Sequence, residues 1–98
     1  MRIALLSNDD GIDAAGLAAL RTVVGERFDE VWVVAPATQM SQIGHRVTTE
    51  GPIRYEQRGP REFAVFGTPA DCVRVALASL LPATPDWVFS GINHGGNL

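Results

Sequence analysis

Two adjacent carboxylates near the start of the chain are the residues best suited to chemistry. Asp9 and Asp10 closely follow a short apolar run, residues 3–6. Neighbouring acids repel each other unless a cation lies between them, and carboxylate oxygens suit a hard ion such as Mg²⁺ or Mn²⁺. The pair therefore predicts a divalent metal site. An ordinary loop, in which one Asp caps the next helix and the other is solvated, explains the same string and stays open at this point.

Small polar residues in two later loops are candidates to complete such a site. Ser41 follows the second apolar run, and Asn93 and Asn97 lie beside Gly95 and Gly96 in the last loop. Hydroxyl and amide oxygens can ligate a metal, and glycine-rich backbone lets N–H groups approach a phosphate closely. Each loop also has an ordinary explanation, because Ser, Asn and Gly are common turn residues.

A third acidic residue, Asp71, has a structural explanation instead. Thr68 suits the N-cap of a helix, Pro69 suits the first helical position, and Asp71 falls at the third. This pattern is typical of a capping box, so Asp71 is predicted to be structural. Cys72 follows on the first turn of an amphipathic helix and is expected to be a small buried hydrophobe rather than a nucleophile.

The elements that position these residues are predicted in α/β order. Leu17, Leu20 and Val24 share one face of a helix that begins near Gly16 and stops at Gly25. The second helix begins at residue 69 and has an apolar face of Val73, Ala76, Leu77, Leu80 and Leu81, with prolines at its end. A strand buried on both faces is expected at residues 3–6 and further buried strands at 31–35 and 87–89, the last of them exposed where it lacks a neighbouring strand. A strand is also expected at 63–66, short strands at 47–49 and 53–55, and turns at 51–52 and 59–60.

This order of elements indicates an α/β fold with a parallel sheet. Ligands gather beyond the carboxyl ends of the strands in such sheets. Three predicted loops follow the carboxyl ends of strands, at residues 7–15, 36–46 and 90–98. The candidate site residues are therefore expected to meet at one edge of the sheet.

Composition limits the possible functions. The chain has 98 residues, a net charge of −3 and a single cysteine, which fits one small globular domain without a disulfide framework. All 8 basic residues are Arg, and no basic stripe suits a nucleic-acid duplex. No apolar run approaches the length of a membrane span or a signal-peptide core, so a cytoplasmic location is expected. The glycine-rich final loop suggests that the chain is the front part of a longer protein.

Four sequence blocks in the same order resemble the SurE family, the survival-protein-E nucleotidases. The blocks are residues 7–12 (SNDDGI), 33–36 (VVAP) followed by Ser41, 67–73 (GTPADCV), and 90–93 (SGIN) followed by Gly96 and Asn97. The resemblance covers nearly the whole chain. It implies a Rossmann-like three-layer sandwich with a mostly parallel sheet, of which residues 1–98 form the N-terminal part of a single phosphatase domain.

The resemblance also implies an activity. Members of this family are divalent-metal phosphatases that hydrolyse nucleoside 5′- and 3′-monophosphates, and some trim short polyphosphate. By motif position, one Mg²⁺ or Mn²⁺ ion falls on Asp9, Asp10, Ser41 and Asn93. Homo-oligomers, dimers or tetramers, are implied, built largely through the later part of the longer family members. That later part also carries the remaining active-site loop, so residues 1–98 alone are expected to be inactive.

Phosphate contacts follow from the same resemblance. Ser41, Asn97 and the amides around Gly95 and Gly96 are expected to hold the phosphate, with Asp9 and Asp10 as catalytic residues. One departure affects the second block. The family usually has Gly directly after the loop serine, whereas this chain has Gln42, with the glycine displaced to position 44.

Three other protein classes also use acids or phosphate loops after a first strand. Phospho-receiver signalling domains carry an acidic pair there, but they need a later phospho-accepting Asp and a Lys. This chain has no Lys, and Asp71 is its only Asp between Glu30 and Cys72. A dinucleotide-binding module requires G-x-G-x-x-G after the first strand, which residues 9–13 do not supply. A haloacid-type phosphatase requires Asp-x-Asp, whereas the two acids here are adjacent. A receiver-type domain, or an inactive chain that only binds metal, remains the alternative.

Overall fold

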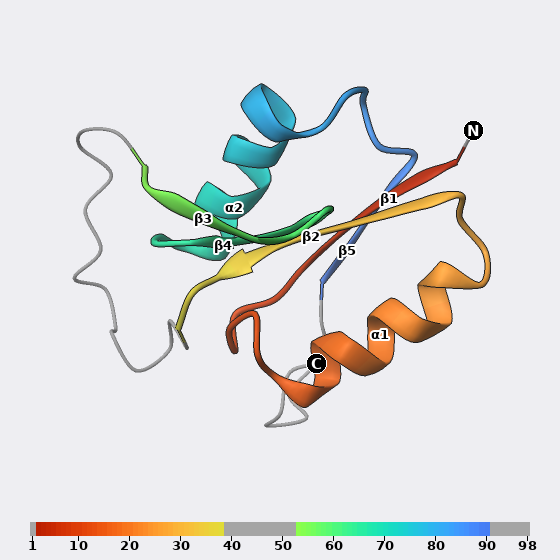
Figure 1. Cartoon of the computed structure of the whole chain (residues 1–98), viewed down its shortest axis with the longest axis horizontal. Helices are drawn as coiled ribbons and strands as arrows, with labels where there is room; N and C mark the ends of the chain where they lie inside the picture. Colours follow the sequence, from red (N-terminus) through yellow and green to blue (C-terminus); the bar gives the residue numbers. More distant parts are fainter. Residues whose placement is uncertain (1, 39–52, 91–98) are drawn as a thin grey trace.

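The computed structural model describes residues 2–38 and 53–90 of the chain (Figure 1). These residues form alternating strands and helices. In chain order, the elements are β1 (Ile3–Ser7), α1 (Ala15–Gly25), β2 (Glu30–Pro36), β3 (Tyr55–Gly59), β4 (Glu62–Val65), α2 (Pro69–Val75), a π-helical turn η2 (Ala76–Leu80) and β5 (Trp87–Ser90).

The strands form one sheet in the order β3-β4-β2-β1-β5. β1 lies between β2 and β5 and is parallel to both, and β4 is parallel to β2. Among the described strands only β3 runs antiparallel. It is joined to β4 by a turn at residues 60–61, one residue later than the predicted turn at 59–60, because Gly59 still pairs with Glu62. The prediction of a mostly parallel sheet is confirmed.

Helices cover both faces of this sheet, with α1 on one side and α2 on the other (Figure 1). All five residues of β1 are buried, and successive side chains point to opposite faces. Leu6 packs with Leu17 and Val24 of α1, whereas Leu5 packs with Cys72 and Ala76 on the α2 side. The result is the α/β/α sandwich expected from the sequence.

The two predicted helix starts are found within a residue of their expected positions. α1 buries Leu17 and Val24 against the sheet, as their spacing predicted. At α2, the Asp71 N–H donates to Thr68 Oγ1 at 3.1 Å, and the Thr68 N–H donates to Asp71 Oδ2 at 2.9 Å. The capping box is therefore confirmed, with Pro69 at the first position.

One prediction of burial was confirmed and another was wrong. The last strand was expected to be exposed without a neighbour, and Trp87 is 57% exposed and Val88 50% exposed because β5 pairs only with β1 among the described strands. Leu77 was placed on the buried face of the second helix and is 51% exposed. The helix changes to an i→i+5 turn there, with the Leu81 N–H donating to Ala76 O, while Leu80 and Leu81 still pack against the core.

Two strand boundaries also differ from the sequence prediction. The strand expected at 53–55 begins at Tyr55 and extends to Gly59, and β4 ends at Val65 with Phe66 exposed. The alternation of apolar residues is too short in this hairpin to fix its ends. The strand predicted at 47–49 and the turn at 51–52 lie outside the described residues.

Candidate functional site

The acidic pair lies where the chain leaves the carboxyl end of β1. Ser7 and Asn8 are each only 4% exposed, whereas Asp9 and Asp10 are both partly exposed. The carboxylates therefore begin at the point where the strand emerges from the core. This is the position that the sequence predicted for them.

A closed turn carries the two acids. The side-chain amide of Asn8 donates from Nδ2 to Gly11 O at 2.9 Å, and its Oδ1 accepts the Gly11 N–H at 3.2 Å. Gly11 has a φ of 108°, a region that residues with a side chain rarely adopt. The requirement for Gly at this position is therefore conformational.

The same turn is bonded to the neighbouring strand. The Ile12 N–H donates to the Pro36 carbonyl at 2.8 Å, at the last residue of β2. The Ala14 N–H donates back to Gly11 O at 3.1 Å, one residue before α1 begins. These bonds fix the loop after β1 against the end of β2.

The carboxyl ends of three parallel strands meet at this edge of the sheet. Leu6 lies opposite Val33 of β2 and Phe89 of β5, and Ser7 lies opposite Ser90. β2 and β5 therefore end beside the acidic turn. The other candidate residues come after these strand ends in the sequence and lie outside the described residues: Ser41, Asn93, Gly95, Gly96 and Asn97.

The donor set of the turn fits a hard divalent cation. Two carboxylates lie next to each other in sequence and reach the surface, and oxygen is the donor that Mg²⁺ and Mn²⁺ prefer. Within residues 2–38 and 53–90, no three His, Cys, Asp or Glu side chains come together in a metal-binding group. Two acids therefore need ligands from outside the described residues, or water, to complete a coordination shell.

The other polar residues near the end of β1 are structural. Asp71 is 3% exposed, and its second oxygen accepts a hydrogen bond from Arg74 at 2.8 Å. Burial raises the pKa of the Cys72 thiol to about 12, the nearby Ser7 hydroxyl offsets part of this shift, and the charge of Asp71 adds to it. Such a thiol stays protonated at neutral pH and is a poor nucleophile. The Ser7 hydroxyl makes no hydrogen bond of ordinary geometry in the described part of the chain.

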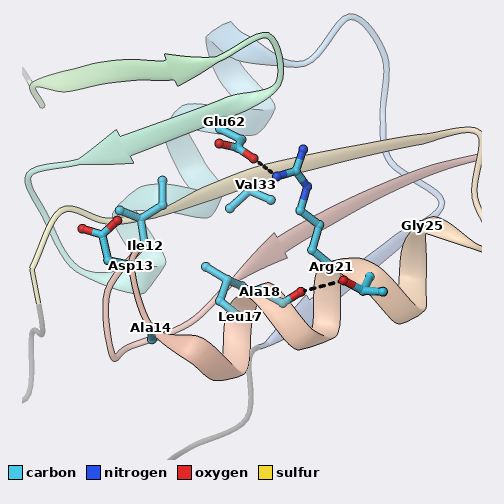
Figure 2. A pocket seen from close by; sticks show the side chains of 10 residues that line it. Ile12, Asp13, Ala14, Leu17, Ala18, Arg21, Gly25, Val33 and Glu62 are labelled. Carbon is cyan, nitrogen blue, oxygen red and sulfur yellow. Dashed lines mark hydrogen bonds and ion pairs between the residues drawn. The ribbon is translucent and has the colours of Figure 1, made fainter.

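A groove of about 600 Å³ begins beside the acidic turn and runs between α1 and strands β2 and β4 (Figure 2). Ile12 and Asp13 lie at one end, and Arg21 and Glu62 point toward each other across it and form an ion pair. No sequence pattern indicates this groove, because its lining comes from elements far apart in the chain. The bonds of Asn8 were also not predicted, and an Asn three residues before a Gly was their only signal.

Comparisons with known proteins agree with the fold and with the sequence motifs. Residues 4–98 match the family model "Survival protein SurE". The chain is 53% identical over 94 residues to the 5′-nucleotidase SurE of Rhodospirillum rubrum, covering 96% of this chain and 36% of that protein. It is 50% identical over 98 residues to the 5′-nucleotidase SurE of Allorhizobium ampelinum, covering all of this chain and 38% of that protein.

A solved structure is also similar. The crystal structure of the SurE protein from Aquifex aeolicus superimposes with a TM-score of 0.87 at 40% identity, covering 98% of this chain and 39% of that one. The chain thus spans less than two fifths of the length of these relatives. None of the helices in residues 2–38 and 53–90 has the length and apolar character needed to cross a membrane.

Proposed function

Because the chain belongs to the SurE family, we propose that the intact protein is a 5′-nucleotidase that uses a divalent metal ion to hydrolyse nucleoside monophosphates. The observation that carries this proposal is the acidic turn at the carboxyl end of β1. It sits at the edge of a parallel sheet where ligands bind in α/β folds. Relatives that match this chain at 50% identity or more are named 5′-nucleotidases.

Asp9 and Asp10 would hold the ion, with Ser41 and Asn93 as further ligands. A bound Mg²⁺ or Mn²⁺ ion supplies charge that stabilises the transferring phosphoryl group and makes a water molecule more acidic. The two carboxylates reach the surface beside the ends of β2 and β5. This arrangement favours the segments after those strands as the source of the remaining ligands.

The phosphate of the substrate would be held by Ser41, Asn97 and the backbone amides of Gly95 and Gly96. Phosphoryl transfer depends mainly on positioning and charge neutralisation, so a turn fixed against two strands suits the reaction. Asp9 and Asp10 are assigned as the catalytic residues. The same proposal includes three further properties of the intact protein: activity on 3′-monophosphates, a homo-oligomeric assembly of two or four subunits, and a cytoplasmic location.

The phospho-receiver alternative finds no support in the described residues. Asp71 is committed to the cap of α2 by its two hydrogen bonds with Thr68. It follows β4 and is buried, so it is not available as a phospho-acceptor. The chain also has no Lys.

A substrate panel on the intact protein tests the proposal. Nucleoside 5′- and 3′-monophosphates are incubated with Mn²⁺, with Mg²⁺ and with EDTA, and released phosphate is measured. The expected result is metal-dependent release from the 5′-monophosphates, with 3′-monophosphates as a second substrate class. Full activity in EDTA would contradict the metal-dependent mechanism. A failure to release phosphate from any nucleotide would contradict the proposed nucleotidase activity.

A further inference from the structure

We propose that Asn8 is a positioning residue for the metal site: its side chain holds the turn that presents Asp9 and Asp10. This inference rests on the metal-binding role proposed above for the two acids. It assigns a function to a side chain outside the proposed set of metal ligands.

Asn8 is almost completely buried, at 4% exposed, and both polar ends of its amide are used. Nδ2 donates to Gly11 O at 2.9 Å, and Oδ1 accepts the Gly11 N–H at 3.2 Å. The two hydrogen bonds close a ring around the backbone of Asp9 and Asp10. The path of the chain through the two acids is therefore set by the side chain of Asn8.

Two further features make this ring rigid. Gly11 adopts a φ of 108°, which allows its N–H and C=O to face the same amide. The next residue, Ile12, donates its N–H to the Pro36 carbonyl at 2.8 Å. The ring is thus attached to β1 through Asn8 and to β2 through Ile12, at the edge where the three strands end.

An amide is the side chain that fits this role. It supplies one donor and one acceptor without a charge, whereas Asp would supply acceptors only and add a third negative charge beside the pair. Like charges in adjacent side chains favour any rearrangement that separates them. A fixed backbone opposes that rearrangement, so the acids keep a common ligand position before the cation arrives.

The inference predicts how metal affinity changes when the ring is opened. Asn8→Ala removes both hydrogen bonds but does not change the two acidic residues themselves. In the intact protein, we expect the Kd for Mn²⁺, measured by isothermal titration calorimetry, to rise about 10- to 100-fold, the range for residues that orient metal ligands. Asn8→Ser keeps a short neutral acceptor for the Gly11 N–H, so its Kd should fall between those of Asn8→Ala and the unaltered protein.

A matched control separates positioning from stability. Val24→Ala shortens a side chain that is 5% exposed in the core under α1, away from the turn. It should lower the melting temperature and leave the Mn²⁺ affinity unchanged. A wild-type Kd in folded Asn8→Ala, or a raised Kd in Val24→Ala at equal loss of stability, would overturn the inference.

Two further variants keep the test decisive. If Asn8→Ala does not fold, Asn8→Ser carries the test, and a wild-type Kd there would contradict the inference while a raised Kd supports it. Asp9→Asn is titrated in parallel. Unchanged Mn²⁺ binding in Asp9→Asn would refute the proposed metal site, whereas lost binding in Asp9→Asn with wild-type binding in Asn8→Ala would refute only the positioning role.

Discussion

Asp71 and the pair Asp9–Asp10 each follow a buried strand of the same sheet, but only Asp71 is withdrawn into the protein. Asp71 is 3% exposed and bonds to the Thr68 N–H and to Arg74. Asp9 and Asp10 stay partly exposed on a turn closed by Asn8. An acid that stays at the surface after a strand is therefore a candidate ligand, whereas an acid that is buried in a helix cap is a structural residue.

The largest expected effect concerns the exposed pair. Asp9→Asn or Asp10→Asn in the intact protein should lower kcat/KM for a nucleoside 5′-monophosphate by more than about 100-fold, because loss of a ligand should cost more than loss of a residue that orients one. Both variants should stay folded, with a melting temperature in EDTA equal to or above that of the unaltered protein, since like-charge repulsion is removed. Near-normal turnover at saturating Mn²⁺ would show that the pair is not the metal site.

The buried acid should behave in the opposite way. Asp71→Ala removes two hydrogen bonds of a buried side chain and leaves the Thr68 N–H without its acceptor. We expect a loss of about 2 kcal/mol in the free energy of unfolding, with kcat of the folded protein close to normal. Urea denaturation and steady-state kinetics on the same sample measure the two quantities, and an unchanged stability with a large loss of kcat would reverse the assignment.

A smaller change tests the other half of the cap. Thr68→Ala removes the acceptor of the Asp71 N–H and should cost about 1 kcal/mol of stability. Ser at this position keeps the hydroxyl, so Thr68→Ser serves as the matched control and should retain most of the stability. A large drop in kcat without a change in melting temperature would mean that Thr68 takes part in chemistry.

The smallest effect is a pH dependence of stability. The Cys72 pKa is raised from 9.0 to about 12 in the folded protein, so the thiol stays neutral there while the unfolded chain ionises. Its contribution to stability is complete below pH 9 and is lost as pH rises from 9 toward 12. Between pH 8 and pH 9.5 we expect the free energy of unfolding to fall by less than about 1 kcal/mol because of this thiol. Urea denaturation at the two pH values measures the fall. Cys72→Ala should show a weaker fall with pH, and an equal fall in both proteins would contradict the assignment to this thiol.

Much of the sheet could be predicted because its signals are local. The apolar run of β1, the spacing of Leu17 and Val24, and the string from Thr68 to Asp71 each identify an element from a few neighbouring residues. The exposure of Trp87 could also be expected, because a strand at the edge of a sheet lacks cover. The exposure of Leu77 could not be predicted, because the π-helical turn at Ala76 depends on packing that apolar spacing does not specify.

The candidate site shows the same division. The position of Asp9 and Asp10 at a strand end could be predicted from the sequence, since the apolar run ends at Leu6, shortly before the pair. The closed turn could not, because it depends on the φ of Gly11 and on the bond from Ile12 to Pro36, a carbonyl 24 residues away in the chain. The contributions of Ser41, Asn93, Gly95, Gly96 and Asn97 are still predictions.

The pairing of β1 with β5 has a consequence for synthesis on the ribosome. The Ile3 N–H donates to Asp86 Oδ2, and the Asp86 N–H donates to Ile3 O, both at 2.8 Å or less, across 83 positions of the chain. β1 can pair with β2 once about the first third of this chain has emerged, but its other edge has no partner until β5 is made. A nascent protein therefore carries an unpaired apolar strand edge for most of the time that these residues are being translated. Because such edges promote association, the step at which this sheet is most vulnerable precedes completion of the protein, and slow translation between β2 and β5 would lengthen it.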